Sequence, residues 1–358
     1  MPHLLVDISS HGYGHVSQTS AVVNELAELM PDLQVTVRTA APLHFLQSRF
    51  RCEFRHIPQA FDFGMKMANA VDVQPGESAA AYREFHADWP EKVECEAQAM
   101  RQLKPDLLLA NVPYLSLAAA RQARVRAVGM CSLNWADIYR HYCADDPSFH
   151  DVHGQMLEAY RSAEYFLKIE PAMAMPDLSN VLSIAPIARV GRALRCHIAA
   201  NSSQLEGEKL VMIAMGGMEF RLPIENWPHI HGIRWIVPQA WNIRRDDVTT
   251  FESLKLGFSD ALASCDAVIT KPGYGMFTEA ACAGVPVMYL TRHDWPEEPF
   301  LVQWLQKNAA CLKVERKLLL AGELDGVLQQ LWSLPLPARP ENNGAVEAAQ
   351  FLRDKLFN

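Results

Sequence analysis

Two histidines and two glycines share one short stretch, HGYGH, at residues 11–15. It follows the strand-like run His3–Ile8 and precedes a helix-like segment, Ser20–Leu29. Imidazole is the side chain best suited to move a proton near neutral pH, and glycines let backbone N–H groups approach a ligand. The stretch is therefore a candidate for general-base chemistry by His11 or His15. Because a G-x-G pattern is a weak signal, a tight turn with two solvated histidines explains it about equally well.

The most informative stretch is TKPGYGMFTEAACAGVP. Gly273 and Gly275 flank the start of a helix that we expect near Met276. A helix N-terminus offers unpaired N–H donors and a partial positive charge, and Lys271 adds a cation on the same side, so a diphosphate would be held well here. Glu279, in the first turn of the expected helix, could accept hydrogen bonds from a ribose. Alternatively, it is an acid that the helix dipole favours without any ligand.

Two further loops follow predicted strands. The stretch AMGGM places Gly216 and Gly217 after a buried strand, where paired glycines expose main-chain N–H groups, although a plain turn explains them equally well. The stretch RHDWPEEPF follows the last strand that we predict. Its charged residues are Arg292, His293, Asp294, Glu297 and Glu298. Carboxylates of this kind commonly bind sugar hydroxyls, whereas a solvated charged loop is the ordinary alternative.

Strand-like and helix-like segments alternate along the first half of the chain. The strands are expected at His3–Ile8, Gln34–Arg38, Phe54–Ile57, within KPDLLLAN and at Val125–Cys131; the helices are expected at Ser20–Leu29, Leu43–Phe50, Ala79–Leu103 and Tyr114–Ala123. This alternation predicts a parallel sheet with helices on both faces. In such sheets ligands bind beyond the carboxyl ends of the strands, which is where the unusual loops lie.

A second series of the same kind begins near residue 208, and the two series join near Ile184–Arg192. We therefore predict an α/β fold of two Rossmann-like domains facing a central cleft. The first would span 1–185 and the second 186–344. The last helix-like segment, within 345–358, could complete the first domain.

Composition narrows the classes of partner. The chain has 358 residues, a net charge of −8 and a pI near 5.9, so it has no basic surplus with which to bind nucleic acid. No N-terminal signal peptide and no run long enough to span a bilayer is evident. The eight cysteines form no CxxC pair, which favours reduced thiols in a cytoplasmic protein over a disulfide framework or a zinc site.

Together these motifs resemble the GT-B glycosyltransferases, the group that holds the UDP-glycosyltransferases and the bacterial lipid-linked N-acetylglucosaminyltransferase. The chain is most similar to the glycosyltransferase-like N-terminal domain of plant arabinose kinases. The shared features are HGYGH, SLNWADIY, KPGYGMFTEA and EEPFL, and the resemblance runs from Leu4 to about Lys313. No sugar-kinase segment follows in the printed sequence, so the resemblance does not imply arabinose kinase activity.

The resemblance also implies roles for single residues. Lys271 stands where the UDP-glycosyltransferases usually have a phosphate-binding histidine, Glu279 matches the acid that holds the ribose, and His15 matches the histidine of the first loop. The acids Asp294, Glu297 and Glu298 fall near the donor-sugar site. The residues expected at the donor and its phosphates are Gly14, Gly216, Gly217, Lys271, Gly273, Tyr274, Gly275 and Met276. Met276 replaces a common hydroxyl residue and Gly275 a common asparagine.

We therefore predict an enzyme that moves a sugar from a nucleotide-diphospho-sugar, UDP-linked in the usual family member, to an acceptor hydroxyl. The base would be His11 or His15, with Asp137 orienting or replacing it, although a helix-capping role for Asp137 is at least as good. Lys271 and the glycine N–H groups would stabilise the leaving diphosphate. No well-placed D-x-D run suggests a metal, and the resemblance implies inversion at the anomeric carbon.

No cofactor is expected, because the nucleotide-sugar is itself a substrate. The acceptor is open between a small molecule, a lipid and a glycan, and peripheral membrane contact stays open as well. Two other functions fit the same fold. One is a sugar-nucleotide epimerase or hydrolase that uses the acids of RHDWPEE, and the other is a non-catalytic nucleotide-sugar-binding protein.

Overall fold

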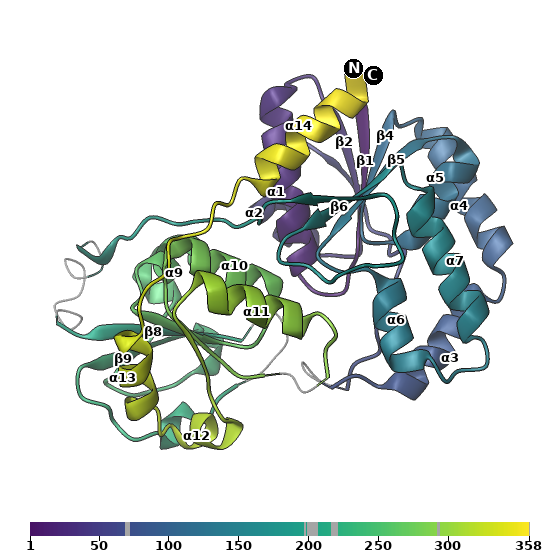
Figure 1. The fold of residues 1–358 in the computed structure, drawn as a ribbon. Helices are drawn as coiled ribbons and strands as arrows, with labels where there is room; N and C mark the ends of the chain where they lie inside the picture. The colour runs from purple at the N-terminus through teal and green to yellow at the C-terminus, as the bar shows by residue number, and fades with distance from the viewer. Residues whose placement is uncertain (69–71, 197, 199–206, 216–220, 292–293, 358) are drawn as a thin grey trace. The chain divides into compact units, whose positions relative to one another are not determined.

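The computed structural model describes residues 1–68, 72–196, 198, 207–215, 221–291 and 294–357. The chain divides into two compact units (Figure 1). Unit 1 comprises Met1–Ile187 together with Asn342–Asn358, and unit 2 comprises Ala188–Glu341. Each unit is an α/β body built on its own parallel sheet, as the alternating sequence pattern predicts.

Seven parallel strands form the sheet of unit 1. They are β1 (His3–Ile8), β2 (Gln34–Arg38), β3 (Arg55–Ile57), β4 (Leu107–Asn111), β5 (Arg126–Cys131), β6 (Tyr165–Ile169) and β7 (Val181–Ile184). The spatial order is β3-β2-β1-β4-β5-β6-β7, so the direction of winding reverses between β1 and β4. All five residues of β4 are buried, which explains why its first four residues are an apolar run rather than an alternating pattern.

Helices cover both faces of this sheet. Figure 1 shows α1 (Gly14–Leu29) and α14 (Gly344–Phe357) on one face, with α4 (Trp89–Leu103), α5 (Tyr114–Ala123) and α7 (Phe149–Ser162) on the other. The two helices of the first face pack against each other, so the C-terminal helix belongs to unit 1. The remaining helices of the unit are α2 (Leu43–Arg49), α3 (Pro75–His86) and α6 (Trp135–Cys143).

Two helices of unit 1 differ from the prediction. Helix α1 begins at Gly14, six residues before the predicted start. The prediction missed these residues because the buried side chains in the first turns include polar ones, so the apolar residues there do not show the helical period. The helix predicted over Ala79–Leu103 is two helices, α3 and α4. Pro90 lies in the first turn of α4, where its fixed φ suits a new helix start but would break a continuous helix.

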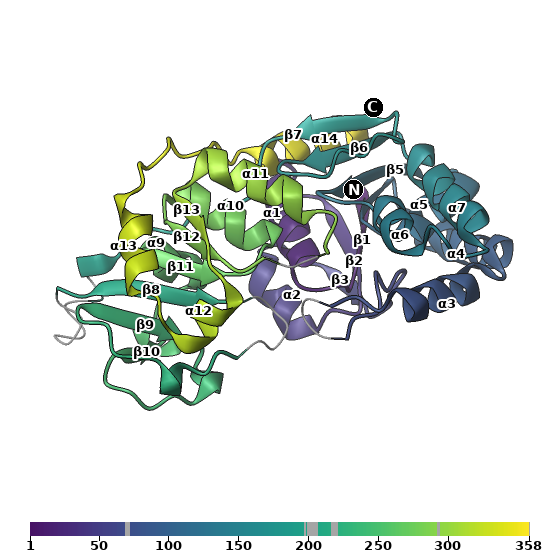
Figure 2. The same ribbon diagram turned by 60° about the horizontal axis from the view of Figure 1, so that its bottom comes forward.

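Six parallel strands form the sheet of unit 2, in the order β10-β9-β8-β11-β12-β13 (Figure 2). They are β8 (Lys209–Ala214), β9 (Ile233–Val237), β10 (Val248–Thr250), β11 (Ala267–Thr270), β12 (Val287–Tyr289) and β13 (Cys311–Lys313). The α-helices described here are α9 (Phe258–Ala263), α10 (Tyr274–Ala283), α11 (Glu298–Asn308), α12 (Arg316–Ala321) and α13 (Asp325–Ser333). Strand β13 was not predicted, so the RHDWPEEPF loop does not follow the last strand.

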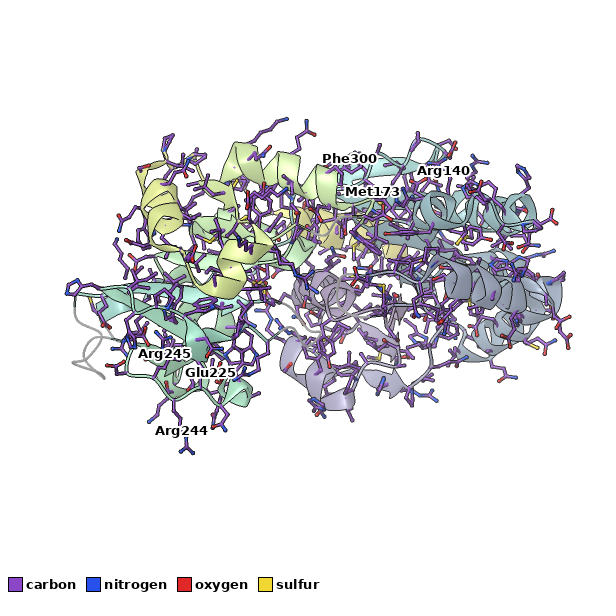
Figure 3. The ribbon with its side chains drawn as sticks, turned by 90° about the horizontal axis from the view of Figure 1, so that it is seen from below. Arg140, Met173, Glu225, Arg244, Arg245 and Phe300 are labelled. Carbon is purple, nitrogen blue, oxygen red and sulfur yellow. The ribbon has the colours of Figure 1, made fainter. Side chains whose placement is uncertain are left out.

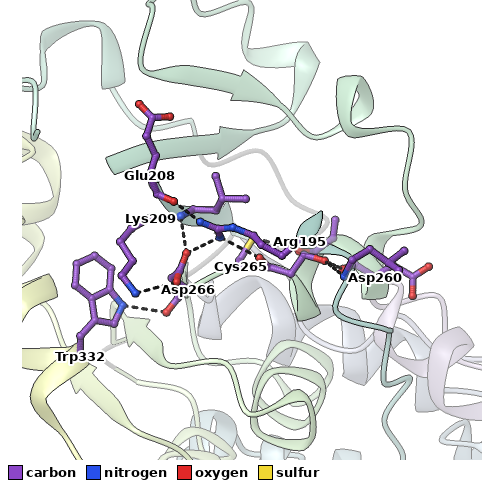
Figure 4. A network of polar contacts seen from close by, with 11 residues as sticks. Arg195, Glu208, Lys209, Asp260, Cys265, Asp266 and Trp332 are labelled. Atoms are coloured by element: carbon purple, nitrogen blue, oxygen red, sulfur yellow. Dashed lines mark hydrogen bonds and ion pairs between the residues drawn. The ribbon is translucent and has the colours of Figure 1, made fainter. Parts of the chain in front are cut away.

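One half-buried acid connects several segments of unit 2 (Figure 4). Asp266, just before β11, accepts hydrogen bonds from Arg195 Nη1 at 2.6 Å, the Leu210 backbone N–H at 2.8 Å and Lys209 Nζ at 3.0 Å. Trp332 Nε1 of α13 donates to the Asp266 carbonyl at 3.0 Å. Burial alone would raise the pKa of Asp266, but these donors outweigh it and hold the pKa below its ordinary value.

No helix in the described part of the chain is both long and apolar enough to cross a lipid bilayer.

Candidate functional site

Each sheet has one place where its strand order reverses, and the HGYGH loop and the loop after β11 start there. In unit 1 the reversal falls between β1 and β4, so the HGYGH loop after β1 is next to the end of β4. In unit 2 it falls between β8 and β11, so the loop after β11 starts beside the end of β8. Ligands of open α/β sheets bind at such points, because neighbouring connections leave toward opposite faces.

His15 lies in the first turn of α1 and is 8% exposed. Its Nδ1 is 2.9 Å from Asn111 Oδ1, at the end of β4, and 3.6 Å from Cys131 Sγ. The amide nitrogen of Asn111 donates to Gln18 Oε1 at 3.1 Å and approaches the His15 carbonyl at 3.5 Å, which turns the amide oxygen toward the ring. Nδ1 of the neutral ring therefore carries the proton, and Nε2 keeps its lone pair.

Burial makes this imidazole a base rather than a cation. Desolvation lowers the pKa of His15, and the hydrogen bond with Asn111 opposes that effect only in part. Since Asn111 is neutral, it orients the ring without supplying the negative charge that would stabilise an imidazolium. The geometry gives a neutral, oriented imidazole at the point where the strand order reverses.

His11 lies in the loop before α1, edge-on to the indole of Trp135 in α6. Their ring centroids are 5.2 Å apart at an interplanar angle of 83°. The same indole contacts the His15 ring, with centroids 6.1 Å apart. The backbone of Gly64 packs directly against His11, because a Cβ placed on Gly64 would come within 2.5 Å of His11 Nδ1. The structure thus brings both predicted histidines against one tryptophan.

A buried acid that sequence analysis did not identify joins this group. Asp62 is 7% exposed, and its carboxylate accepts hydrogen bonds from Ser9 Oγ and Trp135 Nε1, both at 2.8 Å. Burial raises the pKa of Asp62 to about 6, the two hydrogen bonds oppose this, and nearby Asp7 adds to it. The only sequence signal is a single acid between two phenylalanines. We call His11, His15, Asp62, Asn111 and Trp135 the histidine cluster.

Asp137 has local partners in the first turn of α6. Its backbone N–H donates to Asn134 Oδ1 at 2.8 Å, and its carboxylate accepts from Asn134 Nδ2 at 2.9 Å and from Arg140 Nη2 at 2.7 Å. Arg140 (Figure 3) also pairs with Asp177. The residue that caps α6 is thus Asn134, and Asp137 is the acid of the first turn that pairs with this cap. The acid that the structure joins to the histidine cluster is Asp62.

In unit 2, helix α10 begins at Tyr274, two residues before the predicted start. Gly273 is its N-cap and has no side chain with which to bond the N–H groups of the first turn. No other part of the described protein comes within 4 Å of where a Cβ on Gly275 would sit, so there is space beside the backbone at this residue. Met276 is also in the first turn, and Lys271 comes directly after β11. We call residues 271–276 the α10 start.

The earlier start of α10 corrects one expectation. Glu279 lies in the second helical turn, not the first, and the first turn of α10 contains no acidic residue. Because the favourable effect of the helix dipole on an acid fades beyond the first turn, that explanation for Glu279 loses force. The helix ends as expected at Gly284, whose φ of +75° suits glycine.

The acids of RHDWPEEPF divide into two kinds. Glu297 and Glu298 are 6% and 7% exposed, and Trp295 Nε1 donates to Glu297 Oε2 at 3.2 Å. These two acids are therefore not part of a solvated loop, whereas Asp294 is exposed. Four residues of the predicted loops lie outside the described residues: Gly216, Gly217, Arg292 and His293.

Within the described ranges, one group of three potential metal ligands has its donor atoms within 4.8 Å of one another: His229, Asp246 and Asp247. These residues lie at the amino ends of β9 and β10, whereas Lys271 lies at the carboxyl end of β11. The guanidinium of Arg245 (Figure 3) already pairs with both oxygens of Asp247, at 2.8 and 2.6 Å. The Asp247 carboxylate is thus already paired with a guanidinium, and we assign no metal site here.

Comparison with known proteins gives one curated relative and many similar structures. No family model matches the chain. L-arabinokinase of Arabidopsis thaliana is 24% identical over 370 residues, which cover 97% of this chain and 34% of that protein. The chain therefore spans about a third of the length of this relative.

Three of the similar solved structures are glycosyltransferases. The glycosyltransferase of kitacinnamycin has a TM-score of 0.63 at 14% identity and is matched over 99% of this chain and 95% of its own. The calicheamicin glycosyltransferase CalG4 has a TM-score of 0.60 at 15% identity, over 100% and 94%. Phytolacca americana UGT2, solved with UDP-2-fluoro-glucose and pterostilbene, has a TM-score of 0.57 at 13% identity, over 100% and 94%. At such identities, the likeness concerns the fold.

Proposed function

This chain has the GT-B fold of the glycosyltransferases, and from that premise we propose that it transfers a sugar from a UDP-linked donor to an acceptor hydroxyl. The transfer would invert the anomeric carbon and use no metal ion. The observation that carries the proposal is the buried, neutral His15, whose Nδ1 is held by Asn111 so that Nε2 is left as a base. Fold alone does not fix an activity, so the chemistry of these residues has to support it.

The base would act on the acceptor. A hydroxyl is a weak nucleophile until its proton is removed, and His15 Nε2 is the acceptor for that proton. As the oxygen attacks the anomeric carbon, the bond from that carbon to the donor's diphosphate breaks, and the proton stays on His15. His11, across the shared indole from His15, would contact the acceptor. The acceptor is a small molecule, a lipid or a glycan with a free hydroxyl.

The donor would bind to unit 2. The N–H groups at the N-terminus of α10 and the Lys271 ammonium match the negative charge that develops on the leaving diphosphate. The side chain of Glu279 would bind the ribose, while Glu297 and Glu298 would bind the donor sugar. UDP-2-fluoro-glucose in the Phytolacca structure supports a UDP-sugar as the first donor to test. Gly14, at the start of α1 in unit 1, stays a predicted phosphate-binding residue.

The test begins with ligand-induced thermal stabilisation by a panel of nucleotide-sugars, because a specific ligand raises the melting temperature by mass action. UDP-glucose and other UDP-sugars are expected to stabilise the chain more than GDP- or ADP-sugars. Turnover is then measured with and without an acceptor. Product formed only with an acceptor supports transfer. Turnover that needs no acceptor would favour an epimerase or hydrolase, and tight binding without turnover would favour a non-catalytic binding protein.

A further inference from the structure

The structure contains a hydrogen-bonding centre that the proposed chemistry has not used. We propose that Asp62 is a positioning residue: its carboxylate fixes the Trp135 indole, and with it the imidazoles of His11 and His15, in one arrangement. The inference rests on the proposed function for its kinetic consequence. Its structural content concerns only contacts within unit 1.

Asp62 reaches His11 by two routes. Through one oxygen it accepts from Ser9 Oγ at 2.8 Å, and the same Oγ accepts from the backbone N–H of His11 at 3.2 Å. Through the other oxygen it accepts from Trp135 Nε1 at 2.8 Å, and the edge of that indole meets the His11 ring. The backbone and the ring of His11 therefore both depend on this carboxylate.

The direct route to His15 passes through the indole. Trp135 is fully buried, and its backbone N–H is held separately by the Tyr160 hydroxyl at 3.1 Å. The contact with Asp62 gives the indole N–H its hydrogen bond and so favours one rotation of the ring. Because the indole packs against both imidazoles, a rotation of the indole would change its contacts with His11 and with His15.

The segment around Asp62 is itself held firmly. The Tyr82 hydroxyl of α3 donates to the Gly64 carbonyl at 2.7 Å, two residues beyond Asp62. The titratable groups that interact electrostatically with the carboxylate are Asp7 on β1, Tyr82 on α3, Tyr114 on α5 and Tyr160 on α7. The Ser10 backbone N–H adds a third donor to the carboxylate. Three donors converging on one buried carboxylate favour its ionised, acceptor-only form, which suits a fixed anchor.

The matched variants are Asp62→Ala, Asp62→Asn and Trp135→Phe, with Asp32→Asn as the control. Asp32 is an exposed aspartate of the same unit, between α1 and β2. Asp62→Ala removes every acceptor. Asp62→Asn keeps one oxygen and can donate to Ser9, but it removes the charge. Trp135→Phe keeps a ring beside His11 and removes the indole N–H. Circular dichroism and thermal unfolding confirm that each variant folds.

The first readout needs no activity. Protein labelled with 13C at histidine Cε1 gives one NMR signal per ring, and His11→Gln and His15→Gln assign the two of interest. Both signals are expected to shift or broaden in Asp62→Ala and to stay unchanged in Asp32→Asn. If both signals stay in place in folded Asp62→Ala, the inference is overturned. Should that variant not fold, Asp62→Asn and Trp135→Phe decide in the same way.

The second readout separates the inference from the proposed function. UDP release from UDP-glucose is measured with pterostilbene as a first acceptor. In Asp62→Ala, kcat is expected to fall by about 100-fold while the donor KM stays within about twofold, since small displacements of reacting groups have effects of that order. Asp62→Asn and Trp135→Phe should be non-additive when combined. An unchanged kcat in folded Asp62→Ala contradicts the inference. A wild-type protein with no turnover on any donor contradicts the proposed function instead, and the NMR comparison still decides the role of Asp62.

Discussion

The two units share one architecture but provide their candidate chemistry in different ways. Each has a parallel sheet whose order reverses once, and a candidate loop follows a strand at each reversal: HGYGH after β1 and residues 271–276 after β11. In unit 1 the chemistry comes from buried side chains that hydrogen-bond one another, such as His15 with Asn111. In unit 2 it comes from the backbone of the α10 start, which has a glycine N-cap, and from the half-buried side chains of Lys271 and Glu279.

This difference follows from what each site would have to do. A general base needs a defined tautomer and a pKa below the working pH, and both require burial and a fixed partner. A site for a charged diphosphate needs donors that remain accessible until the ligand arrives. Removing one side chain should therefore affect catalytic rate in unit 1 and ligand affinity in unit 2.

His15→Ala gives the largest expected effect. Loss of the base should lower kcat by about 100- to 10,000-fold, the usual range for general-base catalysis, with little change in donor affinity. Transfer rates and calorimetric titration with the donor measure the two quantities. An unaltered rate in this variant, together with an inactive His11→Ala, would move the base to His11.

Sequence patterns were sufficient for much of the fold. The strands His3–Ile8 and Gln34–Arg38 and the helix Tyr114–Ala123 occur with the predicted bounds, because apolar periodicity and local turn signals determine them. The early part of α1 was missed, since buried polar side chains such as His15 and Gln18 do not follow that periodicity. Short strands such as β13 carry too few residues to show a period.

The histidine cluster shows why site prediction from sequence is harder. His11 and His15 could be identified from their loop, because residue type and spacing were both informative. Asn111 and Asp62 could not, since their roles depend on β4 pairing beside β1 and on a segment 51 residues from His11 folding over the loop. Strand order is a tertiary property, and a lone acid or amide in an apolar stretch has no pattern that reveals it.

Glu279→Ala tests the unit 2 side of the comparison. If Glu279 binds the ribose, the variant should bind the donor about tenfold more weakly, the effect of losing a charged hydrogen bond, while its thermal stability stays near that of the wild type. Glu323→Ala, an exposed acid of the same unit, is the control. Calorimetry that finds equal nucleotide affinity in wild type and Glu279→Ala would exclude the ribose role.

Asn111→Asp sharpens the claim that unit 1 keeps its base neutral. A carboxylate beside Nδ1 stabilises the imidazolium, so the pKa of His15 should rise from its lowered value. The acid limb of the pH–rate profile should then move to higher pH, with a smaller loss of rate at pH 8 than at pH 6. An NMR titration of the His15 ring gives the same quantity directly. A profile that does not move would mean that His15 is not the titrating base.

His86 extends the comparison to a buried imidazole with no expected role in catalysis. Its nitrogens contact Gln155 Oε1 at 2.6 Å and the Tyr114 hydroxyl at 2.8 Å, and its ring stacks on Trp89. Burial is the main cause that lowers its pKa to about 4. Above pH 6.5 the ring is neutral in both folded and unfolded chains. As pH falls from 6.5 toward 4, only the unfolded chain gains the proton, so the folded state loses stability, by about 3 kcal/mol at most.

His86→Gln should remove this pH dependence while leaving turnover at neutral pH nearly unchanged. Chemical denaturation at pH 7.5 and 4.5 gives the unfolding free energies, and the difference between the two pH values should be smaller in the variant than in the wild type. His44→Gln, an exposed histidine on α2, should keep the wild-type difference. His86→Gln could instead slow transfer as strongly as His15→Ala. In that case burial in unit 1 would not distinguish a structural imidazole from a catalytic one. The assignment of the base would then have to rest on its position in the sheet alone.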